Sequence, residues 1–271
     1  MKKRLDLLMV EKGIVTARSK AERLIKDGHV TVDGAKITKP GTQTEETAVI
    51  VLNTDMIKYV SRGGLKLERA IERFGVELGG VTAMDVGAST GGFTDCMLQN
   101  GAQKVYAVDV GTGQLNEKLL ADPRVINLEN TNARYIDDTV IPEKVDFVSI
   151  DVSFISLRLI LPAVVGRIKE SGNAVCLIKP QFEAGRENLN KHGVVKDKKV
   201  HIEVIETVCD FVKSLGWQVI GLDYSPVKGP EGNIEYLLRI APQGTSLPCA
   251  AEISPPKTVE AAHTALDTAE K

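Results

Sequence analysis

Hydrophobic and polar residues in the first 40 positions follow two successive patterns. Over residues 4–13 and again over residues 19–30, apolar residues recur three or four positions apart, which predicts two amphipathic helices. Ser19 is a suitable N-cap for the second helix, and Glu22 follows it at the capping-box spacing. Apolar and polar residues then alternate on both sides of an Asp-Gly pair at residues 33–34, which predicts a β-hairpin.

The pattern changes after residue 64. A helix is expected over residues 65–75, and short apolar runs follow, as is typical of parallel strands buried on both faces of a sheet. The last two runs have no helix between them, which favours an antiparallel pair at the sheet edge. Strands are expected at residues 81–86, 104–110, 125–129, 145–150, 174–179, 217–226 and 235–240, with a helix at about residues 197–215.

These elements predict an α/β fold with a Rossmann-like, seven-stranded mixed sheet, preceded by a small α+β domain. Residues from 242 onward lack a core pattern, so we expect them to be disordered or peripheral. The expected parts are residues 1–60, a linker at 61–64, the larger domain at 65–241 and a tail at 242–271.

Composition narrows the class of protein. The chain has 271 residues, of which 43% are hydrophobic and 26% charged, as in ordinary globular proteins. No apolar run approaches the roughly 18 residues of a membrane span, and no signal-peptide cleavage pattern follows the basic N-terminus. Four cysteines form no C-x-x-C pair and four histidines are scattered, which favours free thiols, a cytoplasmic location and no metal.

Charge is distributed unevenly. The net charge is −2, yet residues 1–40 hold ten Lys and Arg against five Asp and Glu, a local net charge of +5. A basic segment of this kind suggests a polyanionic partner such as a nucleic acid. A solvated charged surface is the alternative, and composition alone leaves both open.

The segment VTAMDVGASTGGFTD, residues 81–95, runs from an expected strand through a glycine-rich turn into a helix near Gly92. Gly87 and Gly91 lack the Cβ that would hold the backbone away from a ligand. The segment does not contain the G-x-G-x-x-G of dinucleotide sites, because Ser89 stands two positions after Gly87. Asp85 ends the strand, where a carboxylate would repel phosphates and attract an ammonium group. The loop therefore looks like that of an S-adenosylmethionine (SAM) methyltransferase.

Asp109 ends the next expected strand, 22 residues beyond Gly87. A carboxylate at this position can accept both ribose hydroxyls of a nucleoside cofactor, although NAD enzymes use the same device. The alternative is that Asp85 and Asp109 only cap helices.

Four further charged residues lie where an α/β sheet builds its site. Lys66 opens the helix at 65–75, Asp151 and Lys179 end two buried strands, and Glu235 begins the last one. Charges at the tips of buried strands are costly unless they are paired or used, so we interpret them as functional. A structural network of ion pairs is the alternative.

The motifs of the chain resemble known families. RLDLLM followed by SKAERLIKDGHVTVDG resembles the S4 RNA-binding domain, over about residues 2–60. The order Lys-Asp-Lys-Glu resembles the catalytic tetrad of FtsJ/RrmJ ribose 2′-O-methyltransferases. With YVSRGGLKLE, IDVSFISL, LIKPQFEAGRE and SPVKGPEGNIEYLL, residues 1–241 resemble the TlyA (haemolysin A-type) family of rRNA 2′-O-methyltransferases.

This resemblance implies SAM-dependent methylation of a cytidine ribose in ribosomal RNA, with rRNA or ribosomal subunits as partner. Asn132 stands where FtsJ places an Asp near the adenine, and the YVSRGG junction is a candidate switch that orders the cofactor loop. The cofactor residues expected are Asp85, Gly87, Ala88, Ser89, Gly91, Gly92, Phe93, Asp109, Asn132 and Asp151. The RNA-binding residues expected are Arg4, Arg18, Lys20, Arg23, Lys26 and, in the junction, Arg62.

The resemblance also implies roles for the tetrad. Lys179, its pKa lowered by burial and a neighbouring lysine, would act as general base toward the weakly acidic ribose 2′-hydroxyl. Lys66 would stabilise the developing alkoxide or tune Lys179. Asp151 and Glu235 would orient the ammonium groups. No metal is expected, because the donated methyl group is already attached to a cationic sulfur.

Three alternatives were weighed. The chain could be an S4-type RNA-binding module with an inactive methyltransferase domain, which SAM titration would reveal. A membrane-lysing haemolysin is disfavoured by the absence of an apolar span or a lytic helix in the sequence. Base methylation is disfavoured because IDVSF lacks the proline pair found after the fourth strand of amine methyltransferases.

Overall fold

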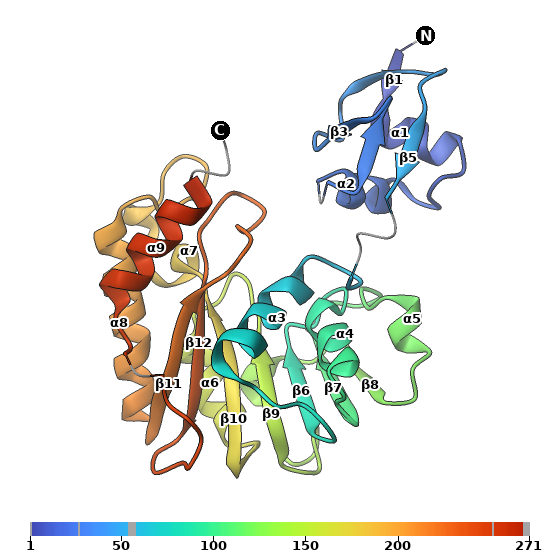
Figure 1. The fold of residues 1–271 in the computed structure, drawn as a ribbon. Helices are drawn as coiled ribbons and strands as arrows, with labels where there is room; N and C mark the ends of the chain where they lie inside the picture. Colours follow the sequence, from blue (N-terminus) through green and yellow to red (C-terminus); the bar gives the residue numbers. More distant parts are fainter. Residues whose placement is uncertain (1, 27, 54–57, 251, 268–271) are drawn as a thin grey trace. The chain divides into compact units, whose positions relative to one another are not determined.

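The structure is a computed structural model that describes residues 2–26, 28–53, 58–250 and 252–267. The chain divides into two compact units, residues 1–58 and residues 59–271 (Figure 1). Each unit has a hydrophobic core of its own.

The N-terminal unit packs two helices against short strands. β2 lies between β3 and β5 in an antiparallel sheet, and β1 pairs with β4. The apolar faces of the helices meet around Leu5, Met9 and Ile25, which are fully buried. The elements are β1 (Lys2–Arg4), α1 (Leu5–Glu11), α2 (Arg18–Lys26), β2 (Val30–Val32), β3 (Ala35–Ile37), β4 (Gln43–Glu45) and β5 (Ile50–Leu52).

Of two local features predicted for this unit, the hairpin turn and the N-cap of the second helix, the structure confirms one. The hairpin turn is confirmed, because Asp33 and Gly34 both have the positive φ, +49° and +81°, that a type I′ turn requires. The predicted N-cap is wrong: α2 begins at Arg18, so Ser19 lies inside it. The helix starts two residues earlier than predicted, which brings Arg18 into it, four positions before Glu22, and the two form a 3.0 Å ion pair.

The second unit is built on the expected seven-stranded mixed sheet, in the order β11-β12-β10-β9-β6-β7-β8. Only β12 runs opposite to its neighbours among the described strands of this sheet, so the antiparallel pair at the edge is confirmed. The strands are β6 (Thr82–Val86), β7 (Lys104–Val108), β8 (Val125–Leu128), β9 (Val145–Ile150), β10 (Ile168–Ile178), β11 (Trp217–Tyr224) and β12 (Tyr236–Pro242).

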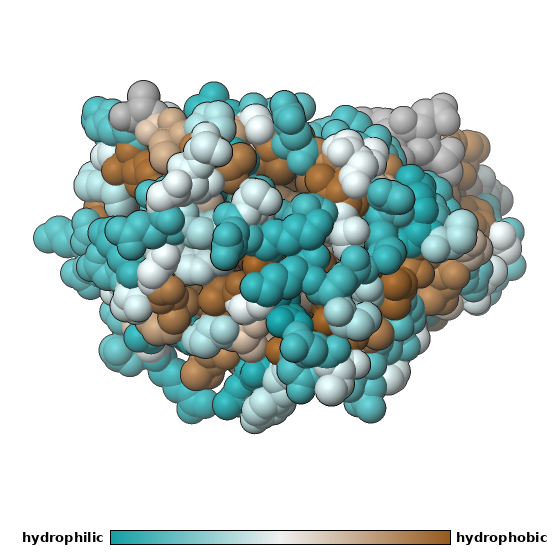
Figure 2. All heavy atoms as spheres, turned by 90° about the horizontal axis from the view of Figure 1, so that it is seen from below, coloured by the Kyte–Doolittle hydropathy of each residue, from teal (hydrophilic) through white to brown (hydrophobic). Residues whose placement is uncertain are grey.

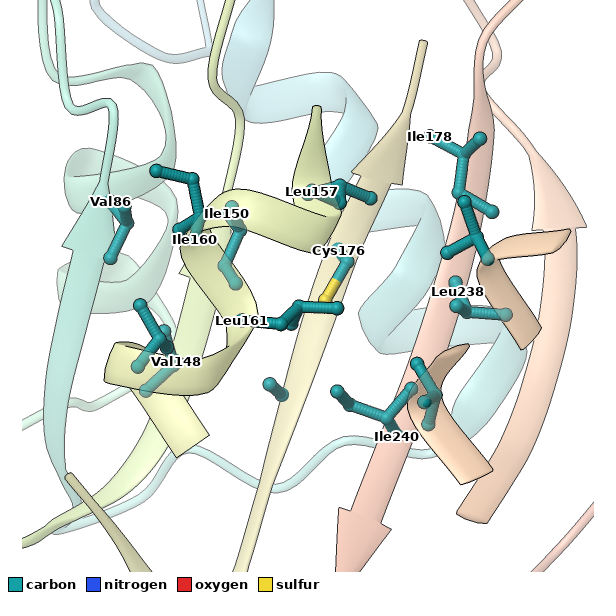
Figure 3. Close-up of a cluster of buried hydrophobic side chains, with 14 of the residues drawn as sticks. Val86, Val148, Ile150, Leu157, Ile160, Leu161, Cys176, Ile178, Leu238 and Ile240 are labelled. Carbon is teal, nitrogen blue, oxygen red and sulfur yellow. The ribbon is translucent and has the colours of Figure 1, made fainter. Parts of the chain in front are cut away.

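Helices cover both faces of this sheet, because successive strand residues point to opposite sides. Ala83 packs with α3 and α4 on one face, and Met84 packs with α6 and α8 on the other. Figure 3 shows the second face, where Leu157, Ile160 and Leu161 of α6 meet the strands. The helices are α3 (Gly63–Phe74), α4 (Gly92–Gln99), α5 (Glu117–Leu120), α6 (Leu157–Val165), α7 (Pro180–Glu183), α8 (Lys198–Ser214) and α9 (Pro255–Asp267).

The surface in Figure 2 mixes hydrophilic residues with small apolar patches. Such mixing is ordinary, since a folded chain has too little polar surface to cover itself completely.

Two predicted boundaries require correction. Residues 61–64 are not a linker, because the second unit already begins at Tyr59 and α3 begins at Gly63. The expectation of a disordered tail is wrong for residues 255–267, which form α9. Val259 and Ala262 of this helix, 1% and 0% exposed, are buried against α8 and β11. These residues have helical spacing, but alanines and threonines dilute the pattern. Residues 268–271 lie outside the described part of the chain.

Candidate active site

The carboxyl edge of the sheet brings together the four charged residues of the expected tetrad. Asp151 follows β9 and Lys179 follows β10, and these two strands are parallel neighbours. Glu235 immediately precedes β12, which runs antiparallel to β10 and so begins where β10 ends. Lys66 reaches the same edge from the first turn of α3.

Asp151 lies between the two lysines. Its Oδ1 is 2.5 Å from Lys179 Nζ, and its Oδ2 is 3.4 Å from Lys66 Nζ. Lys66 also donates a 2.7 Å hydrogen bond to Glu235 Oε2. Glu235 is 1% exposed and each lysine 8%, so these charges are stable only because they are paired.

The ion pairs determine the protonation states of two tetrad residues, Lys66 and Asp151. Burial alone would lower the pKa of Lys66, but Asp151 and Glu235 together raise that pKa above its ordinary value. Burial would likewise raise the pKa of Asp151, and the two lysines hold it below its ordinary value instead. Lys66 is therefore an ammonium and Asp151 a carboxylate at neutral pH.

Two neighbours of the tetrad were missed by the sequence analysis. Ser153 accepts a 3.0 Å hydrogen bond from Lys179 Nζ. Phe154 is 91% exposed, has a φ of +64°, and its ring centroid lies 5.1 Å from that of Phe182. Positive φ in a bulky residue is strained, and such strain gathers at functional sites. The signal in the sequence was that each phenylalanine stands three residues after a charged residue of the expected tetrad, Phe154 after Asp151 and Phe182 after Lys179.

The glycine-rich loop adjoins the tetrad. Gly87 has a φ of +86°, and a Cβ there would collide with the carbonyl of Asp151. Gly91 has a φ of +91°, and a Cβ there would strike Leu119 at the end of α5. These two glycines are therefore required by the chain's own packing, which brings the loop against the tetrad strand.

Asp109 lies beside this loop at the tip of β7 and is partly exposed. Its Oδ2 accepts a 2.8 Å hydrogen bond from Ser89 N, and its Oδ1 accepts one of 2.7 Å from Gly111 N. Each carboxylate oxygen can accept a second hydrogen bond, so the group remains able to bind hydroxyls. Asn132 is exposed, and its Oδ1 caps a short 3-10 helix by accepting a bond from Arg134 N.

Three expected cofactor residues do not face outward. Asp85 is completely buried, and it accepts hydrogen bonds of 2.7 and 2.9 Å from Thr94 Oγ1 and Ser149 Oγ. Its carboxylate therefore anchors the start of α4, which corrects the expectation that it faces a ligand. Phe93 and Ala88, 4% and 6% exposed, belong to the core, so only their backbone is available to a ligand.

The YVSRGG junction packs against the start of α4. Val60 N donates a 2.9 Å hydrogen bond to Asp95 Oδ2. A Cβ on Gly92 would collide with Ser61, and a Cβ on Gly64 would collide with the ring of Tyr59. Arg62 occupies the N-cap position of α3. The junction and the glycine-rich loop are thus in direct contact.

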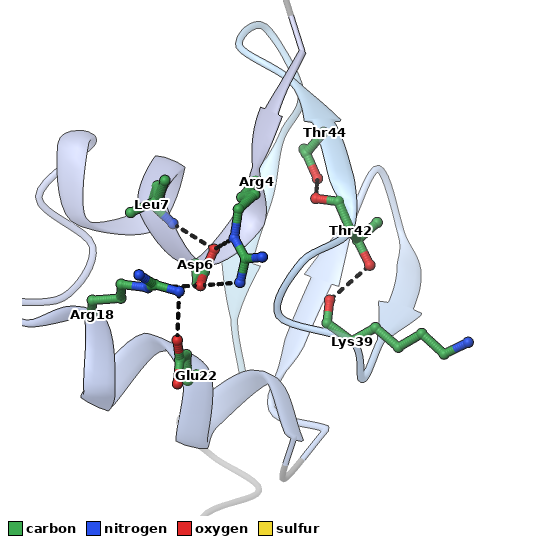
Figure 4. Close-up of polar contacts among 8 residues, drawn as sticks. All are labelled: Arg4, Asp6, Leu7, Arg18, Glu22, Lys39, Thr42 and Thr44. Atoms are coloured by element: carbon green, nitrogen blue, oxygen red, sulfur yellow. Dashed lines mark hydrogen bonds and ion pairs between the residues drawn. The ribbon is translucent and has the colours of Figure 1, made fainter.

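In the N-terminal unit, a buried carboxylate organises two of the basic residues (Figure 4). Asp6, whose side chain is fully buried, accepts hydrogen bonds from Arg4 and Arg18 at 2.8–3.0 Å. The bond from Arg4 above all lowers the pKa of Asp6 to about 2, so the group stays ionised. Lys20 and Lys26 are exposed and Arg23 half-exposed, at three-residue intervals along one side of α2.

The described residues form no helix that is long and apolar enough to cross a membrane. No three of their His, Cys, Asp and Glu side chains are grouped so as to hold a metal ion.

Comparison with known proteins gives consistent matches. The family described as FtsJ-like methyltransferase matches residues 59–241, and the S4 domain matches residues 3–50. YqxC of Bacillus subtilis is 44% identical over 271 residues, covering 98% of this chain and 95% of that protein. The 16S/23S rRNA (cytidine-2′-O)-methyltransferase TlyA of Mycobacterium tuberculosis is 42% identical over 241 residues, covering 89% and 90%. A solved structure from Streptococcus thermophilus, described provisionally as a hemolysin, aligns with a TM-score of 0.79 and 43% identity, covering 99% and 98%.

The burial of Asp85 generates a prediction about stability. Burial raises the pKa of Asp85 from its ordinary 3.8 to about 6. The folded state therefore holds this proton more tightly than the unfolded state, and its contribution to the free energy of unfolding falls as pH rises from 4 to above 6. The total loss is about 3 kcal/mol.

Asp85→Asn should remove this dependence, because an amide can stay bonded to Thr94 and Ser149 without ionising. Urea unfolding at pH 4.5 and 7.5 would measure it. Relative to the unchanged protein, the variant should gain stability at the higher pH. An equal pH dependence in both proteins would show that Asp85 is not the group responsible.

Proposed function

Because the chain belongs to the TlyA family of rRNA 2′-O-methyltransferases, with an S4 domain before an FtsJ-like methyltransferase domain, we propose that it methylates a cytidine ribose of ribosomal RNA. The methyl donor in this proposal is SAM. A substrate of this kind, together with four free cysteines, also supports a cytoplasmic location.

The observation that carries the proposal is the buried chain of ion pairs through Lys179, Asp151 and Lys66, closed by Glu235. Two lysines and two carboxylates at the carboxyl edge of an α/β sheet, beside a glycine-rich loop, suit proton removal next to a bound cofactor. The charges balance within the cluster, so one lysine can change its protonation state without leaving several unpaired charges.

The tetrad residues divide the work in this proposal. Lys179 accepts the proton that the ribose 2′-hydroxyl loses as its oxygen bonds to the methyl carbon. Lys66, held as an ammonium by Asp151 and Glu235, stabilises the negative charge that develops on that oxygen. Asp151 orients both amines. Ser153 fixes the direction of the Lys179 side chain through its hydrogen bond.

The loop residues fit the methyl donor. When bound, SAM supplies a methyl group on a positively charged sulfur. Asp109 would accept the ribose hydroxyls of the cofactor, and the exposed loop at Ser89 would lie against its methionine end. Gly87 brings this loop against the carbonyl of Asp151, so the cofactor site and the tetrad adjoin.

The phenylalanine pair suits the substrate base. Phe154 is almost fully exposed and is supported by Phe182. An aromatic face beside the catalytic amines can stack the base whose ribose is methylated, which requires that base to leave its helix. We assign Phe154 this stacking role.

The N-terminal unit would supply affinity for RNA. Lys20, Arg23 and Lys26 present three cations along one side of α2, where they can contact successive phosphates. Arg4 and Arg18 are held by Asp6, so their guanidiniums are preorganised but partly neutralised.

An RNA-binding module with an inactive methyltransferase domain is the alternative. The complete tetrad and the partly exposed Asp109 argue for catalysis, and SAM titration in the presence of rRNA separates the two functions. Absence of SAM binding would favour the module.

Lys179→Ala is expected to lower the rate of methyl transfer by about 10²-fold or more, because it removes the proton acceptor. Lys179→Arg should be equally inactive, since a guanidinium stays protonated. Transfer of labelled methyl groups to unmodified rRNA measures the rate. Lys144→Ala, an exposed lysine before β9, is the matched control and should retain full activity. Normal turnover by Lys179→Ala would exclude Lys179 as the base.

Asp109→Ala should weaken SAM binding by about 1–3 kcal/mol, because ribose hydroxyls would lose their acceptor. Calorimetric titration measures the affinity, and circular dichroism checks that the variant folds. Asp122→Ala, which removes a carboxylate paired with Arg124, serves as the control. Unchanged SAM affinity in a folded Asp109→Ala protein would require the cofactor site to be reassigned.

Reversing the charge of Lys20, Arg23 and Lys26 should weaken rRNA binding and flatten its salt dependence, by up to about 0.9 in log–log slope per lost phosphate contact. None of these three side chains bonds to Asp6 in the described contacts, so the substitutions leave the ion pairs of Asp6 with Arg4 and Arg18 in place. A control of equal charge reverses three lysines near the amino ends of strands in the second unit, namely Lys144, Lys169 and Lys213. If both triple variants had the same salt slope as the unchanged protein, α2 would not be a phosphate-binding surface.

A further inference from the structure

A cavity of about 460 Å³ lies in the second unit between α3, β11 and the first half of α9. None of its side chains belongs to the tetrad or to the glycine-rich loop. The ionisable and aromatic residues of its lining are Arg69, Arg73, Asp223, Tyr224, Glu252 and Lys257, of which the last two form a 2.8 Å ion pair with each other.

Two guanidiniums share one carboxylate in this cavity. Arg69 donates hydrogen bonds of 3.0 and 3.2 Å to Asp223, and Arg73 Nε donates one of 3.1 Å to the same group. The side chain of Arg73 is 64% exposed, so its terminal N–H groups face solvent. The three groups carry a net charge of +1, which favours an anion.

An aromatic platform lies beside these charges. The guanidinium of Arg69 stacks over the ring of Tyr224, 4.2 Å from the ring centroid. Stacked Arg and Tyr planes are the kind of surface on which unpaired RNA bases are held, whatever the base.

Two elements that line the cavity, β11 and α3, also relate it to the tetrad. In the β11–β12 register, Tyr224 pairs with Tyr236, the residue after Glu235. Along α3, Lys66, Arg69 and Arg73 are spaced by three and then four residues, so they form one row on the helix. The row spans about 10 Å, which is roughly the reach of one to two nucleotides of a single strand.

We infer that this cavity binds the rRNA strand next to the target nucleotide, with a base on the Arg69–Tyr224 platform and a phosphate on Arg73. The inference rests on the proposed function, because it extends the substrate path from the same tetrad. It assigns part of the RNA affinity to the second unit, in addition to that of the S4 domain.

A purely structural role is the competing explanation, in which the two arginines only tie α3 to β11. Asp223→Asn separates the two. It removes the carboxylate that both arginines share, so it should lower the melting temperature under either explanation. If the cavity binds RNA, the same change frees positive charge, and the affinity for RNA should increase. If the arginines are purely structural, the affinity should stay the same or fall.

The experiment measures binding of unmodified rRNA, by filter retention over a range of salt, without SAM so that no methylation occurs. Arg73→Gln should weaken binding about tenfold and lower the salt slope by about 1. Tyr224→Leu should weaken it at least about fivefold. Arg124→Gln, an arginine also paired with an aspartate but located before β8, should bind as the parent does.

Unchanged binding by Arg73→Gln and Tyr224→Leu would overturn the inference. So would unchanged or weaker binding by Asp223→Asn. Because the readout is binding, failure of the inference is distinct from failure of the proposed function, which would appear as no methyl transfer to rRNA by the unchanged protein.

Discussion

The ion pairs of Asp151 with Lys66 and Lys179 are the interaction on which the catalytic unit depends. Charges buried to this degree are tolerated only when an opposite charge lies within a few ångströms. Glu235 completes the balance from β12. The four partners come from one helix and three adjacent strands, so the pairing also requires α3 to cross this edge of the sheet and β12 to insert beside β10.

Asp151 also links the tetrad to the glycine-rich loop. The backbone of Asp151 passes so close to Gly87 that no side chain fits between them. The loop that follows β6 is therefore held at the base of the tetrad, and the junction at residues 59–64 packs on its far end through Gly92. The buried carboxylate of Asp85 accepts a hydrogen bond from Thr94 at the start of α4, which stabilises the position of the helix that follows the loop.

Shared carboxylates recur in both units. Asp6 holds Arg4 and Arg18 in the N-terminal unit, and Asp223 holds Arg69 and Arg73 in the catalytic unit. In each case one acid fixes two guanidiniums; Glu22 also pairs with Arg18 in the N-terminal unit, so net positive charge is left only around Asp223. Arranged in this way, arginines lose little conformational entropy when they meet a phosphate.

The order of the strands along the chain and the antiparallel edge pair were predictable from the sequence, because hydrophobic periodicity is a local signal. The meeting of four charged residues at one edge of the sheet was predicted too, while their catalytic role stays a prediction. Tertiary packing decided the rest. Asp85 and Asp109 stand at similar places in the sequence pattern, yet Asp85 lies within β6, opposite Ala107, and is buried, whereas Asp109 follows the end of β7 and is partly exposed. The difference arises because Thr94 and Ser149, far apart in sequence, converge on Asp85. Phe154, the Arg69–Tyr224 platform and α9 depend likewise on contacts between distant segments, which no local pattern of residues encodes.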